Sequence, residues 1–195
     1  MSYEIECEKR VMLSESQYLE VISFFENEYG PFTYRYLRNR YFDTPNHDII
    51  NAHCMLRIRS EIDKDRLLTL KIEDSDGDIE VSQKVNNYWL RNILEKGMFP
   101  DGDVKTALRI KGFKVETIKC FGHLDTRRLE IKFKDHLLVI DLNYYGNNYD
   151  YNLEIEAKSK EKAEKWILYY CKKFNLKYSK EYLSKSARFF KSLEN

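Results

Sequence analysis

The sequence contains little glycine and proline, the two residue types that most often interrupt regular structure. Its 195 residues include only 7 Gly and 3 Pro, while 33% of them are charged and 14% are aromatic. A disordered chain is usually poor in aromatic residues, so this composition argues for an ordered protein with apolar bulk for a core. The length suits one domain, which we expect to span residues 1–195.

Positive and negative charges are nearly balanced in the sequence, and it contains no long apolar run. The 33 Lys and Arg residues nearly balance the 32 Asp and Glu residues, which leaves a formal net charge of +1. Proteins that bind nucleic acid or membranes usually present a surface of one sign, so we expect neither a stable nucleic-acid partner nor a membrane. The sequence also lacks a run long enough to span a bilayer and the apolar core of a signal peptide.

Cysteine and histidine are scarce, and neither shows the spacing of a metal site. The four cysteines form no Cys-x-x-Cys pair and lie far apart, at Cys7, Cys54, Cys120 and Cys171. We therefore expect buried thiols in a reducing compartment, which predicts a cytoplasmic protein. The four histidines lack ligand spacing as well, so the sequence argues against a zinc site.

Periodic patterns of apolar residues predict many strands with helices between them. Alternating runs predict strands over residues 3–11, 34–43, 55–61, 67–73, 79–83, 115–121, 122–133, 137–144 and 152–157. Helical patterns predict helices over residues 14–27, 88–96, 104–111, 160–174 and 180–193. Ser14 and Gln17 form a capping box that opens the first helix. Antiparallel strands with inserted helices indicate an α+β fold.

Charged side chains occupy every second position of the first predicted strand. They are Glu4, Glu6, Glu8 and Arg10. Because successive side chains of a strand point to opposite faces, one face would carry three carboxylates and a cation. Like charges in a row repel one another unless a divalent cation such as Mg²⁺ or Mn²⁺ lies among them. A solvated edge strand is the alternative interpretation of this segment taken alone.

Five later strands repeat this alternation of charged and apolar positions. Their charged faces carry Arg57 and Arg59, Lys71 and Glu73, Arg128, Glu130 and Lys132, Asp141, and Glu154 and Glu156. Any antiparallel sheet with one solvated face shows such alternation. However, the amphipathic helices must cover the apolar face, and if the sheet closes into a barrel the charged face becomes its interior. Buried charges must then be paired or bound to a ligand, and this mixture suits a polyanion with its metal ion.

Several short motifs follow one another in a distinctive order. They are Glu6-Cys7-Glu8-Lys9-Arg10, Tyr41-Phe42-Asp43-Thr44, Leu56-Arg57-Ile58-Arg59 and Thr69-Leu70-Lys71, then Arg128, Asp141, Glu154-Ile155-Glu156 and Ser184-Lys185-Ser186-Ala187-Arg188. In this order they resemble the motifs of the CYTH family, also called the triphosphate tunnel metalloenzymes, over essentially the whole chain. The likeness is closest to small bacterial members that were labelled as adenylate cyclases.

The resemblance implies an eight-stranded antiparallel β-barrel, the triphosphate tunnel, with helices packed on its outside. Members of the family hydrolyse triphosphates or cyclise ATP, and they need a divalent metal. For binding of Mg²⁺ or Mn²⁺ the resemblance implies Glu6, Glu8, Glu154 and Glu156. For binding of substrate phosphates it implies Arg57, Arg59, Lys71, Arg128, Lys185 and Arg188, and for catalysis Arg10, Glu80 and Asp141.

One position departs from the family pattern, because Arg10 stands where the family motif has a lysine. A guanidinium group is a planar fork of donors, whereas an ammonium group is a point charge. The resemblance predicts metal-dependent hydrolysis of inorganic tripolyphosphate or of a small organic or nucleoside triphosphate. A class IV type adenylyl cyclase that converts ATP to cAMP is the alternative, and a non-catalytic polyphosphate- or nucleotide-binding protein is a further one. Both a monomer and a homodimer are compatible with the sequence.

Overall fold

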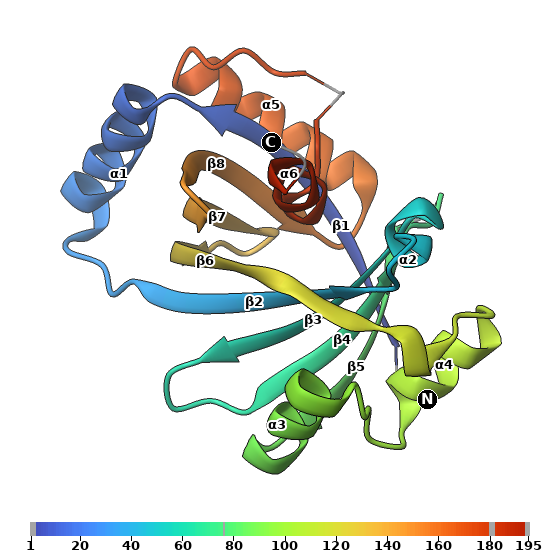
Figure 1. Cartoon of the computed structure of the whole chain (residues 1–195). Helices are drawn as coiled ribbons and strands as arrows, with labels where there is room; N and C mark the ends of the chain where they lie inside the picture. The colour runs from blue at the N-terminus through green and yellow to red at the C-terminus, as the bar shows by residue number, and fades with distance from the viewer. Residues whose placement is uncertain (1–2, 76, 180–181, 194–195) are drawn as a thin grey trace. The chain divides into compact units, whose positions relative to one another are not determined.

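A computed structural model describes residues 3–75, 77–179 and 182–193. It contains eight strands in the hydrogen-bonded order β1-β5-β4-β3-β2-β6-β7-β8, which closes on itself as the strand order of a barrel does. Paired strands run antiparallel, and helices pack around them (Figure 1). The predicted α+β fold with eight antiparallel strands is therefore confirmed. The single domain over residues 1–195 stays a prediction.

The chain forms two compact units. The first unit comprises Met1–Ile5 and Leu37–Leu124, and the second comprises Glu6–Tyr36 and Asp125–Asn195.

The first unit is built on the consecutive antiparallel strands β2 to β5. Its elements are β2 (Arg35–Asp43, from Leu37), α2 (Asp48–Asn51), β3 (Cys54–Glu61), β4 (Arg66–Ile72), β5 (Asp78–Val85), α3 (Asn87–Lys96), α4 (Asp103–Ile110) and a 3₁₀ turn (Val115–Thr117). Alternate apolar residues such as Leu56, Ile58 and Leu70 are fully buried, together with Leu108 of α4. The intervening positions of β3 and β4 carry the predicted charged residues, so the alternation seen in the sequence separates a core face from a polar face.

The second unit pairs its strands in the order β6-β7-β8-β1. Its elements are β1 (Tyr3–Leu13, from Glu6), α1 (Glu15–Tyr29), β6 (Lys119–Lys132, from Asp125), β7 (His136–Tyr145), β8 (Asn148–Ala157), α5 (Lys160–Lys173) and α6 (Lys185–Ser192). Leu129, Ile140 and Leu153 on one face of this sheet are buried in a core. The core also contains Val21 of α1 and Ile167 of α5, so these two helices cover the apolar face. The other face is polar and carries the candidate site.

Most predicted elements are confirmed within a few residues of their ends. The capping box of α1 is present, since the backbone N–H of Gln17 donates to the Ser14 side chain and the Gln17 side chain accepts from the backbone N–H of Ser14. The short helix α2 was not predicted. It forms because the buried carboxylate of Asp43 accepts hydrogen bonds from the backbone N–H groups of Ile49 and Ile50, at 2.9 and 3.1 Å. Asp43 therefore has a structural role at the end of β2.

Two predicted boundaries are wrong. The separate strands predicted over residues 115–121 and 122–133 are a 3₁₀ turn followed by one long strand, β6. Gly122 lies inside this strand with φ of 141° rather than ending it. The last helix begins at Lys185, because the backbone of Ser184 is extended and its side chain accepts from the N–H of Ala187. Lys180, where this helix was predicted to begin, lies outside the described residues.

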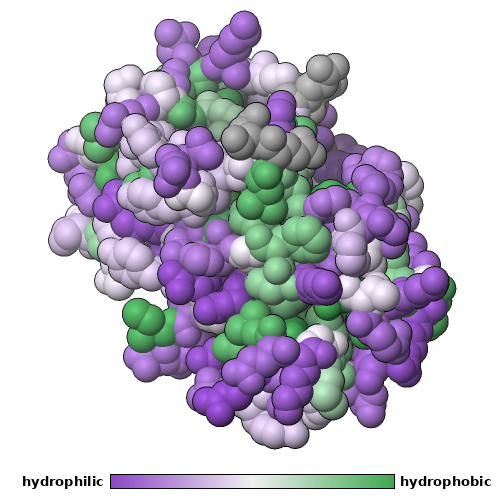
Figure 2. Space-filling view, viewed as in Figure 1, coloured by the Kyte–Doolittle hydropathy of each residue, from purple (hydrophilic) through white to green (hydrophobic). Residues whose placement is uncertain are grey.

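The face drawn in Figure 2 shows mostly hydrophilic residues, with smaller apolar areas between them. The large apolar side chains that are exposed include Leu19, Ile62 and Ile110. In the part of the chain that the structure describes, no helix combines the length and the apolar character needed to cross a membrane.

Candidate functional site

The candidate site lies on the polar face of the β6-β7-β8-β1 sheet, opposite the face that α1 and α5 cover. The register places Arg10 of β1 beside Glu154 of β8, and Glu8 beside Glu156. All four side chains have the same parity along their strands, so they point to the same side of the sheet. The pairing therefore brings together charges from opposite ends of the sequence.

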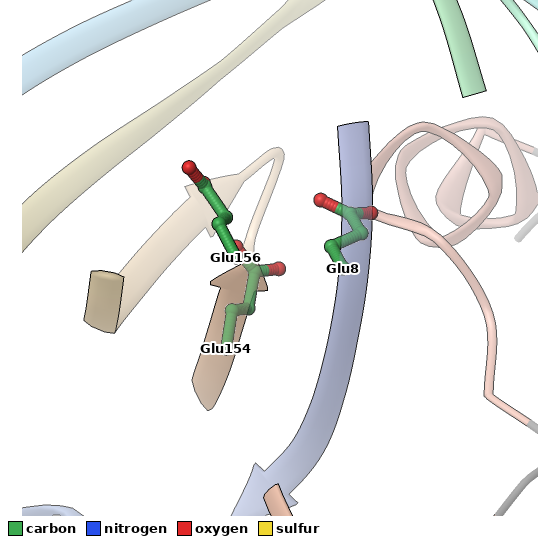
Figure 3. Close-up of side chains that lie close together, drawn as sticks. All are labelled: Glu8, Glu154 and Glu156. Atoms are coloured by element: carbon green, nitrogen blue, oxygen red, sulfur yellow. The ribbon is translucent and has the colours of Figure 1, made fainter. Parts of the chain in front are cut away.

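Three carboxylates form a cluster on this face, which we call the carboxylate cluster. One oxygen of each of Glu8, Glu154 and Glu156 lies within 4.8 Å of the others, and Figure 3 shows them on β1 and β8. Glu154 is 1% exposed, and its Oε1 lies 3.0 Å from Arg10 Nη2 but accepts no well-aligned hydrogen bond from the residues that the structure describes. Converging carboxylate oxygens with an unsatisfied acceptor fit a hard divalent cation. The side chain of Glu6 is not among those described, so its assignment as a ligand stays a prediction.

Arg10 lies against this cluster. Its Nη2 is 2.5 Å from Glu8 Oε1 and 3.0 Å from Glu154 Oε1, and the residue is only 3% exposed. The Tyr182 ring packs on the guanidinium, with its centroid 5.3 Å from Cζ. Burial alone would lower the pKa of Arg10, but Glu154 and Glu8 raise the pKa above its usual value. Arg10 is thus a permanent cation beside the proposed metal ligands.

Asp141 joins two further cations on the same face. Arg128 donates to its two oxygens from Nε and Nη2, each at 2.9 Å, and Lys185 Nζ lies 2.5 Å from Oδ2. Lys185 also donates to Glu154 Oε2 at 2.9 Å. Burial would raise the pKa of Asp141, yet Arg128 and Lys185 hold the pKa below its usual value. Asp141 therefore orients two of the cations that were predicted to bind phosphate.

A network of two asparagines and one ion pair continues this polar face. The buried amide of Asn143 donates to Asn152 Oδ1 at 2.8 Å and to Asp150 Oδ1 at 2.9 Å. Arg188 donates to Asp150 Oδ2 at 2.7 Å and to Asn152 Oδ1 at 3.2 Å. These two asparagines were not predicted as site residues, although Asn143 has the parity of Asp141 on β7 and Asn152 has the parity of Glu154 on β8.

The first unit contains a separate group of predicted site residues. Glu80 Oε1 lies 3.6 Å from both Arg57 Nη2 and Lys71 Nζ, and the register pairs Glu80 with Lys71. Arg59 donates from Nε to Asn39 Oδ1 at 3.0 Å. Glu80 is therefore the counter-charge of two residues that were predicted to bind phosphate. Asn39 is a further partner that the sequence reasoning missed, because nothing in its local pattern marks it.

Comparison with known proteins identifies similar chains over most of this sequence. A family model described as "CYTH domain" matches residues 4–190. "Putative triphosphatase YjbK" of Bacillus subtilis (strain 168) is 33% identical over 157 residues, which cover 80% of each chain. A crystal structure of a "putative adenylate cyclase" from Bacillus halodurans superposes with a TM-score of 0.89 at 29% identity, covering 97% of this chain and 100% of that one. The Hippeastrum protein HpAC1, described as a "putative adenylyl cyclase" that reveals a dominant triphosphatase activity, has the same fold, with a TM-score of 0.74 at 19% identity over 98% of this chain and 96% of that one.

Proposed function

We propose that this chain, which belongs to the CYTH domain family, is a metal-dependent triphosphatase for inorganic tripolyphosphate or a small organic or nucleoside triphosphate. One observation carries the proposal: the carboxylate cluster shares its face with buried cations. Those cations are Arg10, Arg128 and Lys185. Carboxylates suit a divalent metal and the cations suit the phosphate oxygens that accompany it. The name of the Bacillus subtilis relative, a triphosphatase, supports the same reaction.

The metal would be held by Glu8, Glu154 and Glu156, with Glu6 as a fourth candidate ligand. Oxygen donors of this kind favour Mg²⁺ or Mn²⁺ over softer metals. A bound divalent cation would neutralise phosphate charge and polarise a phosphoryl oxygen.

The cations of the chain would bind and orient the phosphate groups. Asp141 fixes the guanidinium of Arg128 with two parallel hydrogen bonds and holds Lys185 beside it. Phosphoryl transfer depends on such positioning and on charge neutralisation more than on covalent chemistry. In hydrolysis, a water oxygen bonds to phosphorus as a bridging P–O bond breaks. In our proposal Asp141 and Glu80 act through the cations they contact, while Arg10 contacts the substrate. The other proposed phosphate ligands are Arg57, Arg59, Lys71 and Arg188.

An adenylyl cyclase of class IV type is the second candidate, because the Bacillus halodurans protein is described as a "putative adenylate cyclase". Such an enzyme directs the ribose 3′-hydroxyl of ATP at the α-phosphate and forms cAMP. One assay separates the candidates: phosphate release from tripolyphosphate, and cAMP formation from ATP, each measured with Mg²⁺ and with Mn²⁺. We expect phosphate release. Formation of cAMP alone would establish the cyclase, and binding without either product would establish the non-catalytic protein.

Removing two arginines of β3 tests the proposed phosphate ligands of the first unit. In the Arg57→Ala, Arg59→Ala double variant, we expect tripolyphosphate to bind at least tenfold more weakly in calorimetry. Each arginine offers charge-assisted hydrogen bonds, which contribute about 1.5–3 kcal/mol. Arg91→Ala is the control, because Arg91 is exposed on α3. An affinity equal to that of the wild type would contradict the assignment of both residues.

A further inference from the structure

Arg10 and the proposed metal compete for the same oxygen atoms. The guanidinium Nη2 lies 2.5 Å from Glu8 Oε1 and 3.0 Å from Glu154 Oε1, and both carboxylates belong to the carboxylate cluster. A divalent cation held by Glu8 and Glu154 would meet a charge of its own sign at hydrogen-bond distance. Repulsion between cations is strong at such a distance inside a protein. The guanidinium and the metal therefore cannot both occupy this position.

Arg10 also has fewer of its nitrogen atoms paired with acceptors than Arg128 has on the same face. Its Nη2 makes both ion pairs, while its buried Nε and Nη1 have no hydrogen-bond partner among the described residues. Arg128 and Lys185 also reach Glu154 Oε2, at 3.4 and 2.9 Å. In contrast to Arg10, however, both donate in addition to Asp141, which is not one of the three carboxylates of the cluster. Buried donors without a partner are unfavourable. Of these three cations, Arg10 therefore loses least by moving, and its unsatisfied nitrogens suit an oxyanion.

We propose that Arg10 is an exchangeable counter-cation of the carboxylate cluster. Without metal, its guanidinium neutralises Glu8 and Glu154. A divalent cation displaces the guanidinium from these oxygens, and the displaced group donates to an oxygen of the phosphate chain. The identity of this anion rests on the proposed function, whereas the competition with metal does not.

The exchange couples metal binding to phosphate binding. Metal binding releases the donors of Arg10, and an anion that draws the guanidinium away makes the cluster more available to metal. By linkage, the two effects must be equal in size. A guanidinium with only a structural role would also repel the metal, but it would stay on Glu8 and Glu154 when the metal binds.

The test measures Mn²⁺ binding by calorimetry, with no phosphate present. We expect the Arg10→Gln variant to bind Mn²⁺ at least tenfold more tightly than the wild type, because the competing cation is gone. Arg91→Gln, the same change at an exposed position of α3, should leave the affinity unchanged and so controls for net charge. Arg10→Lys keeps the charge and should stay within threefold of the wild type. Equal or weaker Mn²⁺ binding by a folded Arg10→Gln variant would overturn the proposal.

A second measurement needs only the wild-type protein in its folded form. The arginine Nε–H signals are followed by NMR as Mg²⁺ is added, and the Arg10 signal is assigned by its absence in Arg10→Lys. We expect the Arg10 signal to shift far more than the Arg128 signal, because the Nε–H of Arg128 donates to Asp141. An unchanged Arg10 signal at saturating Mg²⁺ would refute the exchange. If the wild-type protein hydrolyses tripolyphosphate but its Arg10 signal does not respond to metal, this inference alone is refuted. If the protein binds neither Mg²⁺ nor Mn²⁺, the proposed metal site is refuted as well.

Discussion

Replacing Glu154 by glutamine should reduce the turnover of tripolyphosphate on the order of a thousandfold, which corresponds to about 4 kcal/mol of transition-state stabilisation. Glu154 is buried, belongs to the carboxylate cluster, and lies at 3.0 Å from Arg10 and 2.9 Å from Lys185. Glutamine keeps the size of the side chain but removes the charge that would hold the metal. Initial rates of phosphate release at saturating Mn²⁺ would measure the effect.

The matched control for this variant is Glu20→Gln, which changes an exposed residue of α1 in the same unit. It should keep full activity. A thermal melt of Glu154→Gln without metal would establish that the variant is folded when its turnover is measured. Full Mn²⁺-dependent turnover in folded Glu154→Gln protein would contradict the assignment of the cluster as the metal site.

The sequence predicts which face of each strand is apolar and which is polar, because side chains alternate between the two faces. This prediction does not require knowing which strands are neighbours in the sheet. Apolar Leu56 and Ile58 are buried, as their positions between Arg57 and Arg59 predict. The apolar positions of β7 and β8 follow the same rule, and Leu153 and Ile140 are fully buried. Likewise, Ser14 and its capping partner are local neighbours, so this helix start could be recognised from four residues.

The partners across the sheet could not be predicted, because strand register depends on contacts that are distant in sequence. Nothing local indicates that Arg10 pairs with Glu154 rather than with another carboxylate. For the same reason, the sequence does not predict the two hydrogen bonds that Arg128 donates to the carboxylate of Asp141. The resemblance predicted which residues form the site. The structure shows which of their charges pair with one another.

This pairing explains how a face with so many ionisable groups can be buried without a ligand. Each predicted cation of the second unit lies beside a carboxylate in the structure, as Arg188 does with Asp150 and Lys185 with Asp141. Burial of an unpaired charge is far more costly than burial of a pair. In our proposal a divalent metal would replace Arg10 at the carboxylate cluster, and the displaced guanidinium would then donate to a phosphate oxygen.

The buried position of Asp141 predicts a second large effect, this time on stability. In Asp141→Asn, we expect the free energy of unfolding at pH 7 to fall by about 3 kcal/mol, because removing one member of a buried ionic group leaves two cations with Glu154 as their main remaining counter-charge. Here the partners are Arg128 and Lys185, both at 2.9 Å or less. Urea unfolding followed by circular dichroism would measure the difference. Asp135→Asn, at an exposed position between β6 and β7, is the control and should be neutral.

Acid should reduce the difference between the wild type and Asp141→Asn. Because the pKa of Asp141 is lower in the folded protein than its ordinary value, the carboxylate stabilises the fold fully above the unfolded value of about 3.9. This stabilisation is lost as the pH falls through the lower, folded-state pKa. Asparagine cannot be protonated in this range, so the two unfolding free energies should converge below about pH 4. A constant difference from pH 7 to pH 3 would show that the loss comes from packing and not from the charge that orients Arg128 and Lys185.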